Sequence, residues 1–235
     1  MSFNTKGYAV CRSMFEINTL NQVELCLKNI LNEKTSYEYY QNDVLIRIEN
    51  FIQLDKKLES LLLNDKVMQK VEQFLGGKAS LFKDKVNFKS PGGTPDVLHQ
   101  DIQAKWDNYG TSDFVTIGIP LDKCNIETSC VYFFKNQSKN PRKIFGEYSE
   151  PLSWEDFNKE DFEPLIASPG DVSFHDAFIP HYSESQKSGN LRRIIWLTFN
   201  KSSCGNFRQK YYADKLKSYP PNNRRHKDVE YKFKV

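Results

Sequence analysis

Hydrophobic residues in the first third of the chain recur every three to four positions, the spacing that places them on one face of an α-helix. Asn18 or Thr19 can cap the first of three such helices, and Gly76–Gly77 gives a stop signal after the third. The three apolar stripes are Val23, Leu27, Ile30 and Leu31, then Leu54, Leu58, Leu61 and Leu62, and finally Val67, Val71, Phe74 and Leu75. We interpret all three as packing surfaces and assign them no chemistry.

From about Ser80 the pattern changes to short runs of Val, Ile, Phe, Tyr and Thr, separated by Gly, Pro, Asn and Asp. Short strands with turn signals and no long helix between them favour an antiparallel sandwich or barrel. The runs are KVNFK (85–89), FVTIGIPL (114–121), CVYFF (130–134), DVSFH (171–175) and RRIIWLTFN (192–200). The chain is therefore predicted to be mainly β with N-terminal helices.

The length and composition of the chain are those of a single globular domain of ordinary size. The chain has 235 residues, of which 39% are hydrophobic, enough to form a buried core. We expect a single domain over 1–235, with a helical part at about 1–78, a β core at about 79–202 and a polar surface tail at about 203–235. The net charge of +3 comes from 33 basic and 30 acidic residues spread along the chain. This balance argues against nucleic-acid binding but leaves room for a local positive pocket that holds an anion.

The cysteines and the N-terminal segment bear on the compartment. Five cysteines occur, and no pair has CxxC spacing, so reduced and mostly buried thiols are expected. The segment MSFNTKGYAVCRSMF lacks the basic and apolar regions of a secretion signal, and no apolar run approaches membrane-spanning length. These features predict a cytoplasmic protein that does not associate with a membrane.

The sequence HQD places His99 and Asp101 two residues apart. On a strand, alternate side chains share a face, so the imidazole and the carboxylate would point the same way. Such a pair supplies two neighbouring ligands of a two-histidine, one-carboxylate metal site, whose other face stays open. The HxD pattern alone is common by chance, so a third ligand is needed.

His181 is the favoured third ligand, at the end of PGDVSFHDAFIPHYS. Arg192 follows eleven residues later, where a strand begins, and can form a bidentate pair with a carboxylate. Ser183 can share the face of His181 and donate a further hydrogen bond. His175 is the rival third ligand, but no arginine follows it at a suitable spacing. Arg193 should point to the opposite face from Arg192.

Taken in order, KVNFKSPGG, HQD, PGD…HYS and an arginine eleven residues beyond the distal histidine resemble the phytanoyl-CoA dioxygenase family. The resemblance runs from about Gly7 to the C-terminus. The segments FIPHYS, RRIIWLTFN and RQKYYADKLKSYPP resemble bacterial hydroxylases of aminoalkylphosphonates and other small polar molecules. The resemblance implies a double-stranded β-helix core, which is a cupin-like jelly roll, and an enzyme that oxidises C–H bonds with Fe(II), 2-oxoglutarate and O2.

Carried over residue by residue, the resemblance assigns the iron ligands and the cosubstrate pocket. It makes His99, Asp101 and His181 the ligands and gives Arg192, helped by Ser183, the distal carboxylate of 2-oxoglutarate. It also implies that three further residues line the cosubstrate pocket, namely Lys85, Asn87 and Thr116. The spacing of Lys85 and Asn87 agrees independently, because both would face the same side of one strand.

Candidate substrate contacts follow HQD or lie within CVYFF. They are Trp106, Asn108, Tyr109 and Tyr132, and simple packing is the alternative role for each. The chain departs from the family at Gln186, where Asn is frequent, and at KNQSKNPRKI (135–144), where many members have a Pro-Gly-Ser-His turn. Because that loop commonly borders the substrate entrance, the change leaves the substrate open.

We expect hydroxylation of a small polar metabolite, such as a phosphonate, a quaternary ammonium compound or an amino-acid derivative. A carboxylate at Asp101 favours hydroxylation over halogenation, because related halogenases have a small residue there. The alternatives are desaturation, cyclisation or epimerisation at the same centre, or a non-catalytic cupin-like protein that binds a metal or an anion. The sequence leaves the oligomeric state undecided.

Overall fold

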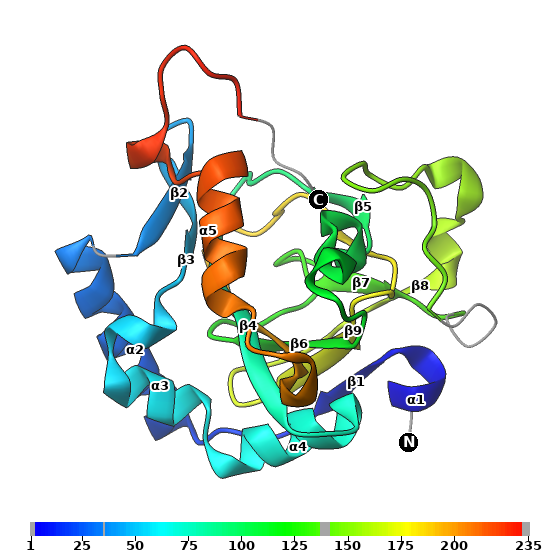
Figure 1. Ribbon diagram of the computed structural model, residues 1–235, viewed down its shortest axis with the longest axis horizontal. Helices are drawn as coiled ribbons and strands as arrows, with labels where there is room; N and C mark the ends of the chain where they lie inside the picture. The colour runs from blue at the N-terminus through cyan, green and yellow to red at the C-terminus, as the bar shows by residue number, and fades with distance from the viewer. Residues whose placement is uncertain (1–2, 35, 137–141, 232–235) are drawn as a thin grey trace.

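The computed structural model describes residues 3–34, 36–136 and 142–231, and within these ranges the strands form two antiparallel sheets (Figure 1). The larger sheet contains, in spatial order, β1 (Tyr8–Cys11), β9 (Val172–Asp176), β6 (Phe114–Pro120), β11 (Arg192–Lys201), β4 (Ala79–Lys89), β3 (Val44–Glu49) and β2 (Tyr37–Gln41). The smaller sheet contains β5 (Asp96–His99), β10 (His181–Ser183), β7 (Val131–Phe134) and β8 (Phe162–Pro164).

Helices α1 (Phe3–Lys6), α2 (Ile17–Glu33), α3 (Lys56–Leu62) and α4 (Asp65–Leu75) cover the outer side of the larger sheet. Helix α5 (Arg208–Ser218) packs on β4, and its Tyr211 and Lys215 face the space between the two sheets. In Figure 1, α2, α3 and α4 follow one another along the edge of the molecule, and α5 lies beside β4. The apolar stripes of α2 to α4 share one core cluster with the larger sheet. None of the described helices combines the length and apolar character needed to cross a bilayer.

The boundaries of these elements differ from the sequence pattern at two places. Glu16 is the N-cap of α2, so the helix begins ahead of Asn18 and Thr19, and neither of these residues caps it. The first 78 residues also contribute β1, β2 and β3 to the larger sheet, although the pattern there predicts only helices. Asn42–Asp43 joins β2 to β3 with φ of 49° and 60°, the left-handed backbone of a tight hairpin turn.

Side chains along β11 point alternately to the two sides of the larger sheet, and each side belongs to a different hydrophobic core. Ile195 and Leu197 pack toward the helices, whereas Ile194 and Trp196 pack toward the smaller sheet. Gly118 on the neighbouring strand β6 makes room for Trp196, because a Cβ at that position would lie 2.5 Å from the indole ring. The Trp196 ring then reaches the ring of His175, with 5.6 Å between the centroids.

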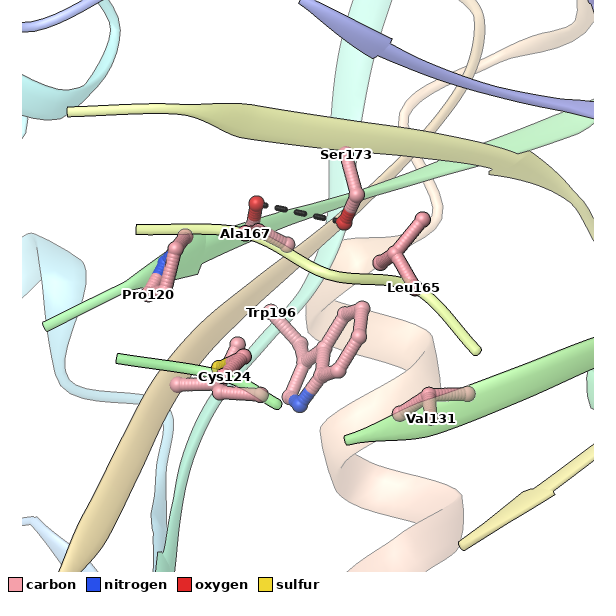
Figure 2. A pocket seen from close by; sticks show the side chains of 9 residues that line it. Pro120, Cys124, Val131, Leu165, Ala167, Ser173 and Trp196 are labelled. Carbon is pink, nitrogen blue, oxygen red and sulfur yellow. Dashed lines mark hydrogen bonds between the residues drawn. The ribbon is translucent and has the colours of Figure 1, made fainter. Parts of the chain in front are cut away.

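A small cavity of about 10 Å³ lies beside Trp196 between the sheets (Figure 2). Its lining is mostly apolar, and Ser173 donates a hydrogen bond of 3.3 Å to the carbonyl of Gly118. A space of this volume holds one water molecule at most. It is a packing defect of the core, and no ligand fits there.

Asp84 on β4 joins α5 and the segment after β3 to the larger sheet. Its carboxylate is fully buried and accepts hydrogen bonds from the backbone N–H groups of Phe51 and Ile52, at 2.7 and 3.0 Å. The same carboxylate forms an ion pair with Arg208 and accepts a hydrogen bond of 3.0 Å from the hydroxyl of Tyr212. Both of the latter residues belong to α5.

Replacing this carboxylate should destabilise the fold. We expect Asp84→Ala to lower the free energy of unfolding by about 3–5 kcal/mol, because a buried guanidinium and two backbone donors lose their acceptor. Denaturant unfolding checks this value, with Asp228→Ala as the control at an exposed residue. A loss below about 1 kcal/mol, similar to the control, would show that Asp84 does not hold these elements together.

Candidate active site

Two histidines face each other across the smaller sheet. His181 on β10 is the register partner of His99 on β5, and their ring centroids lie 4.2 Å apart. One ligand atom from each histidine and one carboxylate oxygen of Asp101 all lie within 4.8 Å of one another. The structure thus brings together the three residues that the sequence pattern singles out as metal ligands.

The backbone between the first two ligands explains why both side chains point the same way. Gln100 keeps extended dihedrals, φ −117° and ψ 138°, so alternation continues one residue beyond β5 before a 3-10 helix begins at Asp101. Gln100 is completely buried, and its N–H donates to Oε1 of Gln103 at 2.8 Å. Its side chain donates to the carbonyls of Lys143 and Phe178. Sequence reasoning gave Gln100 no role, although it fixes the spacing of the ligand pair.

Backbone carbonyls orient both imidazoles. Nδ1 of His99 lies 2.7 Å from the carbonyl of Val97, and Nδ1 of His181 lies 2.9 Å from that of Ile179. A carbonyl only accepts, so each Nδ1 carries the proton and each Nε2 keeps its lone pair for a metal. Burial lowers the pKa of both histidines, and for His181 the neighbouring His99 adds to the effect. The two rings are therefore neutral, as metal ligands require.

Side chains of the larger sheet hold the Asp101 carboxylate in place through hydrogen bonds. Nε2 of His175 on β9 lies 3.0 Å from Oδ2, and the hydroxyl of Thr116 on β6 donates to the same oxygen at 3.3 Å. Thr116 is in turn 3.0 Å from the hydroxyl of Thr198 on β11. Burial alone would raise the pKa of Asp101, but the hydrogen bond from His175 holds it well below its usual value. The carboxylate is thus ionised.

His175 therefore lies outside the ligand group and contacts its carboxylate instead. The donors that do come together, two neutral imidazoles and one carboxylate with an open side toward a cavity, fit Fe(II). Sequence reasoning weighed His175 only as a rival ligand and gave it no role behind Asp101. A partner behind a ligating carboxylate cannot be read from spacing, because it comes from a different sheet.

The cavity in front of the ligands measures about 750 Å³. Of the residues singled out from the sequence, His99, Asp101, His181, Lys85, Asn87, Thr116, Trp106 and Arg192 line it. Ser183, Asn108, Tyr109 and Tyr132 are not among the lining residues. Tyr109 donates a hydrogen bond of 3.0 Å to Asp214, and Tyr132 stacks on Tyr182 with centroids 5.0 Å apart. Residues 137–141 of the divergent loop lie outside the described ranges.

Arg192 lines this cavity and is only 2% exposed. Its Nη1 donates to the carbonyl of Ser129, whereas its Nε has no hydrogen-bond partner among the residues that the structure describes. A buried guanidinium with a free donor is costly unless an anion completes its hydrogen bonds. Arg192 is therefore suited to the carboxylate of a small acid such as 2-oxoglutarate.

Ser183 and Lys89 lie close to Arg192. Lys89 is the register partner of Arg192, and its ammonium donates to the hydroxyl of Ser183. Both side chains also contact the carboxylate of Asp96, to which Lys89 lies at 3.2 Å. Sequence reasoning named Ser183 but missed Lys89. Lys89 could have been found from the sequence, because Lys85, Asn87 and Lys89 occupy alternate positions along one strand.

Several named proteins are similar to this chain in sequence. Residues 3–194 match the family described as phytanoyl-CoA dioxygenase (PhyH). The chain is 32% identical over 191 residues to a 2-aminoethylphosphonate dioxygenase of an uncultured bacterium, covering 80% of this chain and 71% of that protein. It is 30% identical over 181 residues to a methylphosphonate hydroxylase of Gimesia maris, covering 74% and 65%. A probable alpha-ketoglutarate-dependent hypophosphite dioxygenase of Stutzerimonas stutzeri is 25% identical over 233 residues, covering 86% and 79%.

Solved structures share the fold at lower identity. EctD from S. alaskensis with bound Fe superposes with a TM-score of 0.76 at 14% identity, over 88% of this chain and 78% of that one. The epimerase SnoN in complex with Fe3+ and alpha ketoglutarate gives 0.70 at 14% identity, over 85% and 81%. The fold, the histidine–aspartate–histidine group and these relatives define a non-haem iron dioxygenase that depends on 2-oxoglutarate. The chain belongs to the phytanoyl-CoA dioxygenase family.

The two roles assigned to the histidines predict different losses of metal affinity. His181→Ala removes a donor atom and should abolish stoichiometric Fe(II) binding. His175→Ala leaves the three donors in place and should weaken binding only about 10- to 100-fold, because Asp101 loses a hydrogen bond that orients it. Anaerobic calorimetry with Fe(II) measures both constants. Equal losses in the two variants would place His175 among the ligands.

Proposed function

We propose that this protein is a single-domain hydroxylase that replaces one C–H hydrogen of a small phosphonate with a hydroxyl group. 2-Oxoglutarate and O2 are consumed, and succinate and CO2 are released. One oxygen atom of O2 enters the product and the other enters succinate, so the four electrons taken up by O2 come from the C–H bond and from the oxidative decarboxylation. The ligand group opening into a strongly basic cavity is the observation that carries this proposal.

The charge of the cavity lining supports a substrate that is an anion. Two carboxylates line the described part of the cavity, Asp96 and Asp101, and the cations are far more numerous. The lining cations are Arg47, Lys83, Lys85, Lys89, Arg192, Lys215 and Arg225. One such cation serves the far carboxylate of 2-oxoglutarate, and the remainder favour a second anion. Two of the relatives are named for phosphonates, which carry such a charge.

Each residue has a defined task in this proposal. His99, Asp101 and His181 hold Fe(II), which together with 2-oxoglutarate supplies the oxidising chemistry. Arg192 and Ser183 bind the distal carboxylate, which fixes the keto acid in one orientation. Lys85, Asn87 and Thr116 line the cosubstrate pocket, and Thr116 also holds Asp101 in position. Trp106 is 1% exposed and forms part of the substrate wall.

Binding of 2-oxoglutarate tests the assignment of Arg192. Titration of the anaerobic Fe(II) protein with 2-oxoglutarate should produce the weak visible charge-transfer band of the chelate. Arg192→Ala should raise the dissociation constant at least about 30-fold, since a buried charge pair is lost. Arg193→Ala is the matched control, because the neighbouring Arg193 pairs with Asp122 and Glu24 on the other face.

A band of equal affinity in the Arg192→Ala and Arg193→Ala variants would show that the cosubstrate carboxylate lies elsewhere. Iron bound without any band in the wild-type protein would favour a protein that binds a metal or an anion without catalysis.

The mass of the product distinguishes hydroxylation from desaturation or cyclisation. With a small alkylphosphonate, wild-type protein should form one succinate per oxidised substrate, and the product mass should rise by one oxygen atom. Loss of two hydrogens instead would indicate desaturation or cyclisation at the same centre. Succinate formation that no phosphonate stimulates, while other small acids do, would overturn the phosphonate assignment and leave the oxygenase class intact.

A further inference from the structure

One strand carries a cation at each end of a run of side chains that line the cavity. Lys83, Lys85, Asn87 and Lys89 alternate along β4, and all four line the cavity. Lys89 is paired in register with Arg192, whereas Lys83 is paired with Thr198, six positions further along β11. At about 3.3 Å per residue the two ends are roughly 20 Å apart. A single molecule of 2-oxoglutarate bound at Arg192 therefore leaves the cations at the Lys83 end without an anion.

Lys83 and Lys85 have no anionic partner of their own. Within the described part of the chain, neither side chain donates a hydrogen bond or forms an ion pair. Lys83 is 9% exposed, and its ammonium lies over the rings of Trp106 and Tyr211, 5.2 and 5.7 Å from their centroids. Aromatic faces partly compensate a cation but leave its hydrogen bonds unmade. Its donors are therefore available to a ligand in the cavity.

Two further cations share one carboxylate nearby. Glu49 on β3 is fully buried and lies 2.6 Å from the ammonium of Lys215 on α5 and 3.4 Å from Arg47. Lys83 and Lys85 both lie within electrostatic range of Glu49. Four cations thus share two nearby carboxylates, Glu49 and Asp101, which leaves an excess of positive charge.

The local pKa values reflect this excess. Burial and the neighbouring Lys85 and Lys215 lower the pKa of Lys83 well below its usual value. Burial lowers the pKa of Lys85, and it lowers that of Lys215 to about 8 despite the ion pair with Glu49. A ligand with two negative charges would relieve both the desolvation and the mutual repulsion. A phosphonate carries about this charge at neutral pH, with three acceptor oxygens.

We propose that Lys83 and Lys215, with Arg47, form a second anion site that binds the phosphonate group of the substrate, and that this substrate carries no ammonium group. The inference rests on the proposed hydroxylation of a phosphonate and specifies where the phosphonate binds. Lys83 is paired with Thr198, six positions along β11 from Arg192, so cosubstrate and substrate have separate anion sites.

The carboxylates of the cavity lining indicate that the substrate carries no ammonium group. An ammonium in this cavity would need a carboxylate to offset the surrounding cations. Among described residues the lining offers Asp96, which is bonded to Lys89 and Ser183, and Asp101, which belongs to the metal ligands. The residues outside the described ranges contain no Asp or Glu. An aminoalkylphosphonate would therefore place its ammonium among cations.

Calorimetry on the metal-free protein tests the site without requiring turnover, with ethylphosphonate as the probe. Lys83→Met keeps the length and packing of the side chain, and it leaves no buried carboxylate unpaired, because Lys83 forms no ion pair with a described residue. This variant should weaken ethylphosphonate binding about 10- to 150-fold, the value of a hydrogen bond to a charged group. Lys217→Met is the control, an exposed lysine on the same helix as Lys215.

The charge-transfer titration with 2-oxoglutarate separates the two anion sites. It should be unchanged in Lys83→Met. Unchanged ethylphosphonate affinity in that variant, or a parallel loss of 2-oxoglutarate affinity, would overturn the second site. If ethylphosphonate binds at Lys83 but is never oxidised, the proposed function fails while the anion site stands.

The ammonium group is tested with a matched pair of ligands. 2-Aminoethylphosphonate differs from ethylphosphonate only in that an ammonium group replaces one hydrogen. Wild-type protein should bind ethylphosphonate at least about tenfold more tightly, because the ammonium meets like charges. Equal or tighter binding of the amino compound would overturn this half of the proposal.

Discussion

The Asp101 carboxylate is the point where the two sheets meet at the active site. It lies two residues beyond the end of β5 in the smaller sheet, yet its oxygen accepts hydrogen bonds from His175 and Thr116 of the larger sheet. His175 is positioned in turn by Trp196, which can pack there only because residue 118 is glycine. The geometry of the metal ligands thus depends on how the sheets pack as well as on local backbone. A change in sheet spacing would move the carboxylate relative to both histidines.

The same two-sheet arrangement determines where charge can be buried. Alternation on β4 directs Asp84 toward α5 and the neighbouring Lys83 and Lys85 toward the cavity. On the α5 side, Asp84 is neutralised by Arg208. On the cavity side, Glu49, Asp96 and Asp101 are outnumbered by the cations. The fold therefore balances its structural charges internally and leaves the cavity positively charged, a state that burial makes costly until an anion binds.

Sequence spacing predicted the parts of the site that lie within single segments. His99 and Asp101 follow from alternation, and His181 with Arg192 follows from the motif order of the family. The role of His175 could not be predicted, because its partner is 74 residues away on another sheet. The strands among the first 78 residues were missed, since their charged residues face the cavity or solvent and hide the apolar period. Lys83 and Lys89 could have been found by extending the alternation of Lys85 and Asn87 in both directions.

The placement of the cations also limits the size of the substrate. Lys83 and Lys85 are both within electrostatic range of the Asp101 carboxylate, so the second anion site lies close to the metal ligands. A phosphonate bound there would place the carbon attached to phosphorus, or the next one, nearest to the ligands. The rings of Trp106 and Tyr211 lie against the Lys83 ammonium, which leaves little room for a long chain beside it. A short phosphonate satisfies both limits, and a long one could reach the ligands only by withdrawing its charge from the lysines.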